Sequence, residues 1–585
     1  MNVSSLRKVW NILAPSERKG AMALLVLMVV GMMLETLGIG MVIPAVSLLA
    51  QEDVTDRYPA LRPALDALGN PDHEALIIAG VLMLVGIYFI KATFLAFLAW
   101  RQMRFAFNLQ ARLSQQLFTI YLHQPYTFHL QHNSAQLIRN AITEVGVFTS
   151  NAVIPGTLLL TEGMILIGIA SLLFVFEPLG ALTVVFVLSL AVWGFYRATH
   201  AHVLHWGRLR QYHEGLRLQQ LQEGLGGVKD VKLLGREREF LMRYDVHNAQ
   251  SARTMRLHAT LHQIPRLWME VLAVTGLAIL VLVMLAQGRN MASVIPTLGL
   301  FAAAAFRLMP SVTRVLSSVQ SLRYGLPVIN TLHAELCLRP VDPVIHDPAD
   351  RNILQKEIRL IDVGFTYPGA ISPTLSHLLF VVRKGETVGI IGPSGSGKST
   401  LVDIILGLLS PDNGQVLVDG RDIHLNLRSW QDQIGYVPQA IYLTDDTLRR
   451  NVAFGLPSDQ IDDAAVWRAI KAAQLETFVS SLPQGLETLV GERGVRLSGG
   501  QRQRIGIARA LYHDPEVLVL DEATSALDTV TERDVMRAVM ALRGRKTILI
   551  VAHRLSTVEH CDRLCRIDKG TLAEEGTPHS LLASL

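Results

Sequence analysis

The residues best suited to chemistry lie in the stretch "GIIGPSGSGKST", Gly389 to Thr400. An apolar run breaks there into a glycine-rich turn, and the helix-like segment "LVDIILGLL" follows. Glycines let backbone N–H groups converge on a phosphate, and a helix N-terminus adds positive potential. We expect Lys398 to reach the β- and γ-phosphates of a nucleotide and Ser399 to ligate Mg²⁺. By itself this loop is typical of many nucleoside triphosphatases.

Two further motifs narrow the chemistry. "EVLVLDEATSALD" predicts a buried strand with two carboxylates at its end, Asp521 and Glu522. Asp521 suits Mg²⁺, and Glu522 can polarise or deprotonate an attacking water. "RLSGGQRQRIGIARAL" places Ser498, Gly499 and Gly500 at a helix start, where backbone N–H groups form a second phosphate-binding concavity. One chain has no use for two such concavities around one γ-phosphate unless the second serves a partner's nucleotide. The motifs therefore predict a dimer with two ATP molecules at its interface.

The composition indicates that part of the chain lies in lipid. Its 585 residues are 50% hydrophobic, with a mean hydropathy of +0.32, which is more apolar than a soluble protein. The net charge of +4 is too small and too dispersed to favour a nucleic-acid partner. Cys337, Cys561 and Cys565 all lie in the polar C-terminal part, where reduced thiols are favoured over a disulfide framework or a zinc site.

Apolar runs of roughly 20 residues predict six membrane-spanning helices. They lie near residues 21–50, 75–100, 154–176, 179–196, 264–287 and 291–310. The expected fold class is an all-α six-helix transmembrane domain (1–326) with long cytosolic helix extensions, a linker (327–356) and an α/β P-loop ATPase domain (357–585). Basic residues before the first span and an acidic loop after it predict a cytoplasmic N-terminus and ATPase domain. The first run is too long for a signal-peptide core and is expected to be an uncleaved anchor.

Two segments between the expected spans combine small residues, charges and short apolar patches. "NSAQLIRNAITEV", Asn133 to Val145, and "LGGVKDVKLLGREREF", Leu225 to Phe240, are expected to be exposed elbows that dock on another domain. Plain solvated loops are the alternative, although they are uncommon at this length.

With these motifs the C-terminal part resembles the ATP-binding cassette (ABC) transporters. The resemblance implies that Tyr367 in "FTYPG" stacks on adenine, that Gln439 in "YVPQ" contacts Mg²⁺, and that His553 in "VAHRLST" holds the γ-phosphate. It also implies that "GERG", Gly491 to Gly494, reads the cytosolic elbows. The implied ATP-binding residues are Tyr367, Gly392, Pro393, Ser394, Gly395, Ser396, Gly397, Lys398, Ser399, Thr400, Ser498, Gly499, Gly500, Gln501 and Asp528. The implied catalytic residues are Glu522, His553 and Gln439, and the implied Mg²⁺ ligands are Ser399, Gln439 and Asp521.

Six spans ahead of one cassette resemble an exporter-type half-transporter. This implies a homodimer that hydrolyses ATP with Mg²⁺ and moves its cargo by alternating access. ATP would close the two cassettes, and hydrolysis would reset them.

Basic residues inside or beside the apolar runs predict an anionic cargo. They are Lys91, Arg266, Arg307 and Arg314. Because a charge in the bilayer is costly, such groups face a partner or a water-filled cavity. The alternatives stay open at this point: Glu35, Glu162 and Glu270 are also intramembrane, so some charges would only neutralise one another, and Lys91 and Arg314 could snorkel to the inner surface.

"ETLGIGMVIP", "PRLWME" and "FRLMPSVTR" resemble the bacterial lipid-linked oligosaccharide flippase family of protein N-glycosylation. This implies transfer of a polyprenyl-pyrophosphate-linked oligosaccharide from the inner to the outer leaflet of the inner membrane. Lys91, Arg266 and Arg314, with Arg307 as a weaker fourth, would bind the pyrophosphate. "RYPALRPALDALG", Arg57 to Gly69, would form an external helix that engages the lipid tail, or a simple amphipathic cap.

Other cargoes and one other class of protein remain alternatives. A lipid A-like glycolipid would use the same basic ring, whereas a peptide or a hydrophobic drug would not need it. An ATP-gated channel or a regulatory receptor is disfavoured because the candidate catalytic carboxylate, Glu522, is intact.

Overall fold

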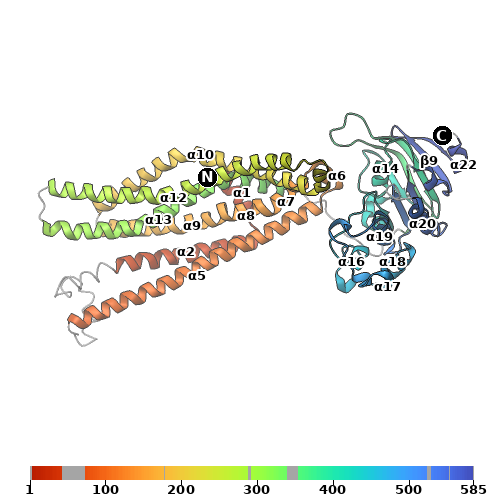
Figure 1. Cartoon of the computed structure of the whole chain (residues 1–585). Coiled ribbons are helices and arrows are strands. Elements are labelled where there is room, and N and C mark those ends of the chain that lie inside the picture. The colour runs from red at the N-terminus through yellow and green to blue at the C-terminus, as the bar shows by residue number, and fades with distance from the viewer. Residues whose placement is uncertain are drawn as a thin grey trace. The chain divides into compact units, whose positions relative to one another are not determined.

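A computed structural model describes residues 3–41, 73–176, 178–286, 291–338, 353–523, 529–552 and 554–583. The chain divides into two compact units (Figure 1). The helical unit comprises Met1–Gln124 and His132–Pro340, and the second unit comprises Pro125–Gln131 and Val341–Leu585. The short helix α6 (Tyr126–Gln131) therefore belongs to the second unit, although its neighbours in the chain belong to the first.

Long helices build the helical unit. They are α1 (Val3–Ile12), α2 (Pro15–Gly40), α5 (His73–Leu122), α9 (Ile154–Phe176), α10 (Pro178–Gly226), α12 (Glu237–Ala286) and α13 (Met291–Leu336). Among the described residues, three helical stretches meet the length and hydropathy of a membrane span, namely Pro15–Gly40, Ile77–Leu122 and Ser134–Val175. Their apolar residues occur all round the helix, as lipid-exposed helices require.

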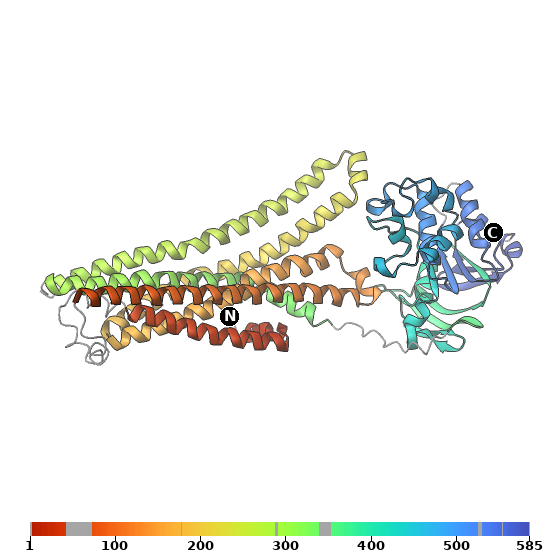
Figure 2. The same ribbon diagram turned by 90° about the horizontal axis from the view of Figure 1, so that it is seen from below.

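The helices of this unit lie side by side. The central helix α13 contacts α9, α10 and α12, and α2 contacts α5 and α9. Figure 2 shows α10 and α12 diverging together from the other helices toward the end that carries α11 (Val228–Leu233). Pro265 and Pro310 lie inside continuous helices, so Pro310 does not end the helix that carries Arg314.

The stretch from Asn133 to Val145 differs from its expected role as an exposed elbow. It forms α7 (Ser134–Arg139) and the π-helix η2 (Asn140–Glu144), and Asn140 and Glu144 are completely buried. The expectation of exposure holds for Ile138 and Ile142 but not for Asn140 and Glu144, because small residues beside charges can also mark close helix packing. By contrast, α11 has no buried residue and lies in the second expected elbow.

The ends of several helices differ from the expected boundaries. Helix α13 continues to Leu336, past the expected end of the membrane domain at residue 326. Helix α10 begins at Pro178, so most of the expected turn "EPLG" is already helical. The proposed external helix, with Tyr58, Leu61, Leu65 and Leu68, lies outside the described residues.

The second unit contains two sheets. The first has the strand order β2-β1-β4-β5 and is antiparallel, whereas the six-stranded sheet has the order β10-β9-β3-β8-β7-β6. The antiparallel strands are β1 (Glu357–Phe365), β2 (Leu375–Arg383), β4 (Asn413–Val418) and β5 (Arg421–Asp422). The six-stranded sheet contains β3 (Thr387–Ile391), β6 (Ile434–Val437), β7 (Val517–Asp521), β8 (Thr547–Val551), β9 (Arg563–Asp568) and β10 (Thr571–Gly576).

Continuous apolar runs explain the centre of the larger sheet. Every residue of β3, β7 and β8 is buried, and these strands pair in parallel, as expected for strands covered on both faces. Helices surround the sheets: α14 (Lys398–Ile405), α15 (Leu427–Gln431), α16 (Leu448–Val452), α17 (Asp463–Ala472), α18 (Glu476–Ser481), α19 (Gly499–Leu511), α20 (Thr529–Met540), α21 (Leu555–Val558) and α22 (Pro578–Leu582).

Candidate functional site

The glycine-rich loop joins β3 to α14, as its sequence predicts. Gly395 and Gly397 have φ angles of 80° and 103°, which favour glycine. A Cβ atom on Gly392 would lie 2.1 Å from the carbonyl oxygen of Ile567, so a larger residue does not fit. Lys398 Nζ donates hydrogen bonds to the carbonyl oxygens of Gly392 and Pro393, at 3.0 and 2.9 Å. The loop thus curls around its own lysine.

The electrostatics of Lys398 suit an anion. The residue is 5% exposed, and burial lowers the pKa of its ammonium group, while Glu522 and Asp521 act in the opposite direction. The negative charge of a bound phosphate would stabilise the protonated ammonium group of Lys398, which burial destabilises.

The two strand-end carboxylates lie beside this loop. Asp521 ends β7 and is 8% exposed, and Tyr436 lies with its hydroxyl 3.5 Å from Asp521 Oδ2. Burial and then Asp521 raise the pKa of the Tyr436 hydroxyl. Gln439 Nε2 donates a hydrogen bond to Glu522 Oε2 at 2.7 Å. The structure thus brings together the residue expected to contact Mg²⁺ and the residue expected to activate the attacking water. Glu522 has a φ of 49°, which turns it away from the strand direction.

Aromatic and acidic side chains also lie close to α14. The Tyr367 hydroxyl lies 3.2 Å from Thr400 Oγ1, so the residue expected to stack on adenine is anchored to the P-loop helix. Burial, then Asp521, raises the pKa of Asp403 to about 6. Burial, then Asp403 and Tyr367, raises the pKa of Tyr126 of α6. Sequence reasoning did not find Asp403 or Tyr126, because only the fold brings them to this site.

The second expected concavity begins α19. Ser498 is its N-cap: Ser498 Oγ accepts from the Gln501 N–H at 3.2 Å, and Gln501 Oε1 accepts from the Ser498 N–H at 2.8 Å. This capping box uses two polar groups and leaves Gly499 and Gly500 in the first turn, where helix N–H groups lack helical acceptors. Helix α19 contacts α16, α17 and β6, whereas α14 contacts β7.

These residues fit a triphosphate with Mg²⁺. The loop offers a buried lysine, glycines with positive φ, and Ser396 Oγ, which is buried without a hydrogen-bond partner. Ser399 is exposed in the first turn of α14, and Asp521 and Gln439 are the expected metal ligands. Hydroxyl, amide and carboxylate oxygens are the donors that Mg²⁺ prefers. Asp528 and His553, also expected at this site, lie outside the described residues.

One buried carboxylate near these motifs escaped the sequence analysis. Glu532 of α20 is 6% exposed and accepts hydrogen bonds from Arg554 Nη1 and Thr557 Oγ1, both at 2.7 Å. It therefore anchors the segment that follows His553 in the chain. In the sequence, the only sign of this carboxylate is a glutamate shortly after "SALD". Its partners Arg554 and Thr557 lie more than twenty residues later, so the sequence does not reveal the contacts.

The basic residues of the membrane part are paired with the glutamates that offered the alternative reading. Lys91 Nζ lies 3.2 Å from Glu35 Oε1, and both are buried. Arg314 Nη1 lies 2.9 Å from Glu162 Oε1.

The third pair is more open. Arg266 Nε lies 3.0 Å from Glu270 Oε1, and the Arg266 side chain is 77% exposed. Arg314 is 51% exposed, although Glu162 is only 5% exposed. The side chain of Arg307 lies outside those described. The buried ion pair with Glu35 thus neutralises the charge of Lys91. Arg266 and Arg314 also have carboxylate partners, but part of each arginine side chain stays exposed.

Comparisons with known proteins agree with this architecture. The family described as "ABC transporter transmembrane region" matches residues 21–305, and the family described as "ABC transporter" matches residues 375–525. An ATP-dependent lipid A-core flippase of Cupriavidus metallidurans is 32% identical over 99% of this chain and 94% of its own length. Flippases of the same name from Cupriavidus pinatubonensis and Vibrio vulnificus are 33% and 30% identical, covering 88% and 93% of this chain and 86% and 93% of their own lengths.

A solved structure supports the fold. A bacterial Atm1-family ABC exporter with ATP bound superimposes with a TM-score of 0.78 at 24% identity, covering 97% of this chain and 96% of the other. The resemblance to the oligosaccharide flippase is not confirmed by these relatives, which carry a different cargo in their name. The expected fold class and the use of ATP with Mg²⁺ are confirmed. The chain is a membrane protein that couples ATP hydrolysis to transport, and it belongs to the ABC transporter family as an exporter-type half-transporter.

Proposed function

We propose that this protein is an ATP-driven flippase for a lipid A-core-like glycolipid in the bacterial inner membrane. The observation that carries the proposal is the similarity to lipid A-core flippases along almost the whole chain, including the membrane domain that must select the cargo. Such a glycolipid has phosphate groups and acyl chains. It takes precedence over a polyprenyl-pyrophosphate-linked oligosaccharide, because the names of the relatives described above support a lipid A-core cargo and not that oligosaccharide.

We further propose that two of the basic residues meet the lipid phosphates. Arg266 and Arg314 combine a carboxylate partner with a largely or half exposed guanidinium group. The partner restrains each guanidinium, and its remaining N–H groups are available to a phosphate, which arginine binds with two donors. Lys91 is buried against Glu35 and has the weaker claim. The position of Arg307 in α13 keeps it as a further candidate.

The working unit we propose is a homodimer with a cytoplasmic N-terminus and ATPase domain. Lys398, Asp521 and Glu522 of one subunit would face Ser498 and its two glycines in the partner, so that each nucleotide lies between two chains. Bound MgATP would supply the β–γ phosphoanhydride bond whose hydrolysis, with transfer of the γ-phosphoryl group to water and release of ADP, drives the cycle. Of this chain's residues, Gln439 orients Glu522 through the hydrogen bond at 2.7 Å, which places the base that accepts the proton of the attacking water.

A flipping assay in proteoliposomes tests the cargo. Fluorescent lipid A-core glycolipid and a fluorescent polyprenyl-pyrophosphate oligosaccharide are offered separately, with ATP and Mg²⁺. Movement of the first and not of the second supports the proposal. Movement of the oligosaccharide alone would favour the polyprenyl-pyrophosphate-linked oligosaccharide as the cargo. Movement of neither lipid would refute both cargo hypotheses.

The basic residues have their own test in the same vesicles. Arg314→Gln and Arg266→Gln should lower lipid movement more than basal ATP hydrolysis if they bind phosphate. Equal loss of both activities would instead indicate that they maintain the fold. Arg359→Gln is a matched control, because it breaks an exposed arginine–glutamate pair, with Glu357, in strand β1 of the ATPase unit.

A further inference from the structure

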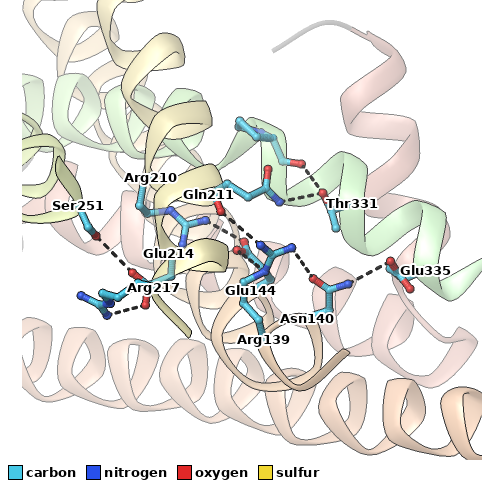
Figure 3. A network of polar contacts seen from close by, with 11 residues as sticks. Arg139, Asn140, Glu144, Arg210, Gln211, Glu214, Arg217, Ser251, Thr331 and Glu335 are labelled. Carbon is cyan, nitrogen blue, oxygen red and sulfur yellow. Dashed lines mark hydrogen bonds and ion pairs between the residues drawn. The ribbon is translucent and has the colours of Figure 1, made fainter. Parts of the chain in front are cut away.

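A network of buried and partly buried polar side chains lies in the helical unit, outside the nucleotide site and the membrane ion pairs (Figure 3). The junction cluster, as we call it, comprises Arg139, Asn140, Glu144, Arg210, Gln211, Thr331 and Glu335 of this network and also Tyr121, which donates a hydrogen bond to Glu335. At its centre Arg210 Nη2 donates to Glu144 Oε2 at 2.8 Å, and their side chains are 5% and 0% exposed. Arg139 approaches the same carboxylate at 3.8 Å. Burying such charges is costly, so a pair of this kind indicates a specific role in the arrangement of helices.

The cluster lies at both places where the chain leaves the helical unit. Asn140 Nδ2 and the Tyr121 hydroxyl each donate to the Glu335 carboxylate at 3.0 Å. Tyr121 precedes the segment Pro125–Gln131, which belongs to the ATPase unit, and Asn140 follows it. Glu335 lies at the end of α13, just before the chain passes to the ATPase unit for good. One carboxylate therefore joins the flanks of both connections.

The other half of the cluster fixes these flanks to α10. Arg139 Nη1 donates to the carbonyl oxygen of Gln211 at 3.4 Å, and Gln211 Nε2 donates to Thr331 Oγ1 of α13 at 2.8 Å. Helix α10 approaches so closely that a Cβ atom on Gly215 would lie 2.0 Å from Arg139 Nη1. The Arg139 guanidinium group therefore lies directly against the backbone of α10 at Gly215.

The backbone beside the cluster has an unusual form. Asn140 and Glu144 are the first and last residues of the π-helix η2, and a second π-helix, η3, spans Thr149–Val153. Single π-turns inside α-helices are rare and often mark functional positions. Here η2 directs an amide and a carboxylate from one turn into the buried cluster.

We propose that the junction cluster couples the two units, with Glu144 and Glu335 as positioning residues. They hold both chain connections to α10 and α13, so that a movement of the connections during the ATP cycle carries these two helices with it. The proposal rests on ATP-coupled transport, which the family shows, and not on the identity of the cargo. Without the cluster the ATPase would run while α10 and α13 lag behind.

Spin-label distances within one chain test this directly. The full-length protein is placed in nanodiscs of phosphatidylethanolamine and phosphatidylglycerol, with labels at the exposed native Cys337 and at Ala201→Cys on the exposed face of α10. Cys561 and Cys565 are buried and will not react. Labelled protein is diluted with unlabelled protein so that distances within a chain dominate. Distances are measured without nucleotide and with ATP and vanadate.

The variants remove the central ion pair or the contacts to Glu335, while Arg139 keeps its hydrogen bonds to the carbonyl oxygen of Gln211 and to Asn140 Oδ1. They are Glu144→Gln with Arg210→Gln, Glu335→Gln, and Tyr121→Phe. Wild type should give one narrow distance distribution in each condition. The variants should give a broadened or divided distribution after trapping with vanadate, while the KM for ATP stays unchanged. In vesicles, lipid A-core glycolipid moved per ATP should fall about fivefold or more, the lower range of typical coupling between sites.

A matched control separates coupling from general packing. Glu17→Gln removes an arginine–carboxylate pair between α2 and α5, in which Arg112 Nε and Nη2 donate at 2.6 and 2.7 Å, without touching the cluster. The proposal is overturned if the cluster variants keep the wild-type distances, or if Glu17→Gln broadens them equally. If wild type moves no lipid A-core glycolipid, the cargo is refuted, whereas the distances still decide the role of the cluster.

Discussion

At the scale of single residues, the clearest chemistry belongs to Glu522. Its carboxylate follows a buried strand and accepts a hydrogen bond from Gln439, and we propose it as the base for the attacking water. Glu522→Gln keeps the size and loses the base. We expect ATP turnover to fall about a hundredfold or more, with nucleotide affinity retained, because general-base catalysis is worth that much. Phosphate release and binding of a fluorescent nucleotide analogue measure the two quantities.

Glu476→Gln is the control for that substitution, since Glu476 pairs with Lys471 on the surface of the same unit. Its turnover should match wild type. If Glu522→Gln also matched wild type, the base would have to be another residue.

Asp403 predicts a pH dependence of stability. Its pKa is raised from 3.8 to about 6, chiefly by burial and then by Asp521. The folded state therefore holds this proton more tightly than the unfolded state, so its contribution to stability is complete below 3.8 and is lost as the pH rises through about 6. Asp403→Asn stays neutral and should gain roughly 1–2 kcal/mol relative to wild type above that range, a value reduced for partial exposure.

Thermal unfolding of both proteins across this pH range provides the measurement. The difference between Asp403→Asn and wild type should be small in acid and grow toward neutral pH. A difference that is constant with pH would show that the Asp403 carboxyl titrates normally.

At the scale of elements, a close contact between helices explains why α10 carries a glycine at position 207. A Cβ atom on Gly207 would lie 2.4 Å from the backbone oxygen of Tyr324 in α13, and backbone cannot give way as a side chain can. Gly207→Ala should destabilise the helical unit by about 1–3 kcal/mol through overpacking. In the same helix, a Cβ atom on Gly194 would meet no atom within 4 Å. Gly194→Ala should therefore keep or raise stability, by up to about 1 kcal/mol from helix propensity.

Thermal unfolding midpoints in detergent check this pair of substitutions. Equal effects of the two alanines would mean that α10 and α13 separate more easily than their contact at Gly207 suggests.

The elements also show where sequence reasoning ends. The apolar runs and the strand–loop–helix around Lys398 are local signals, and the structure has helices and strands there. The stretch at Asn133–Val145 was assigned to an exposed elbow, whereas Asn140 and Glu144 are buried. Their partners Arg210 and Glu335 are distant in sequence, so no periodicity along the chain could reveal the pairing.

At the scale of the whole molecule, the proposed homodimer predicts how two inactivating changes combine. Lys398→Ala disables the P-loop, and Ser498→Arg blocks the concavity at α19. Mixed dimers are purified by two different tags, one on each chain. A dimer in which one chain carries Lys398→Ala and the other carries Ser498→Arg should keep one complete site and about half of the turnover. A dimer in which one chain carries both changes and the other chain is wild type should have no complete site, because each site uses the P-loop of one subunit and Ser498 of the other. Equal turnover of the two mixed dimers would contradict shared sites.

The sequence by itself determined the two-part architecture, the ATP chemistry and the transporter family, because short contiguous motifs and long apolar runs carry those signals. It also identified four membrane basic residues and three glutamates, but it left open whether the charges were free or paired. The spacing of Arg266 and Glu270 already indicated an i, i+4 pair, but only the tertiary structure decided that Lys91 and Arg314 have glutamate partners on other helices and that Glu144 and Glu335 join distant helices. The physical reason is that an ion pair depends on the distance between side chains in space, which the folding of separate helices sets.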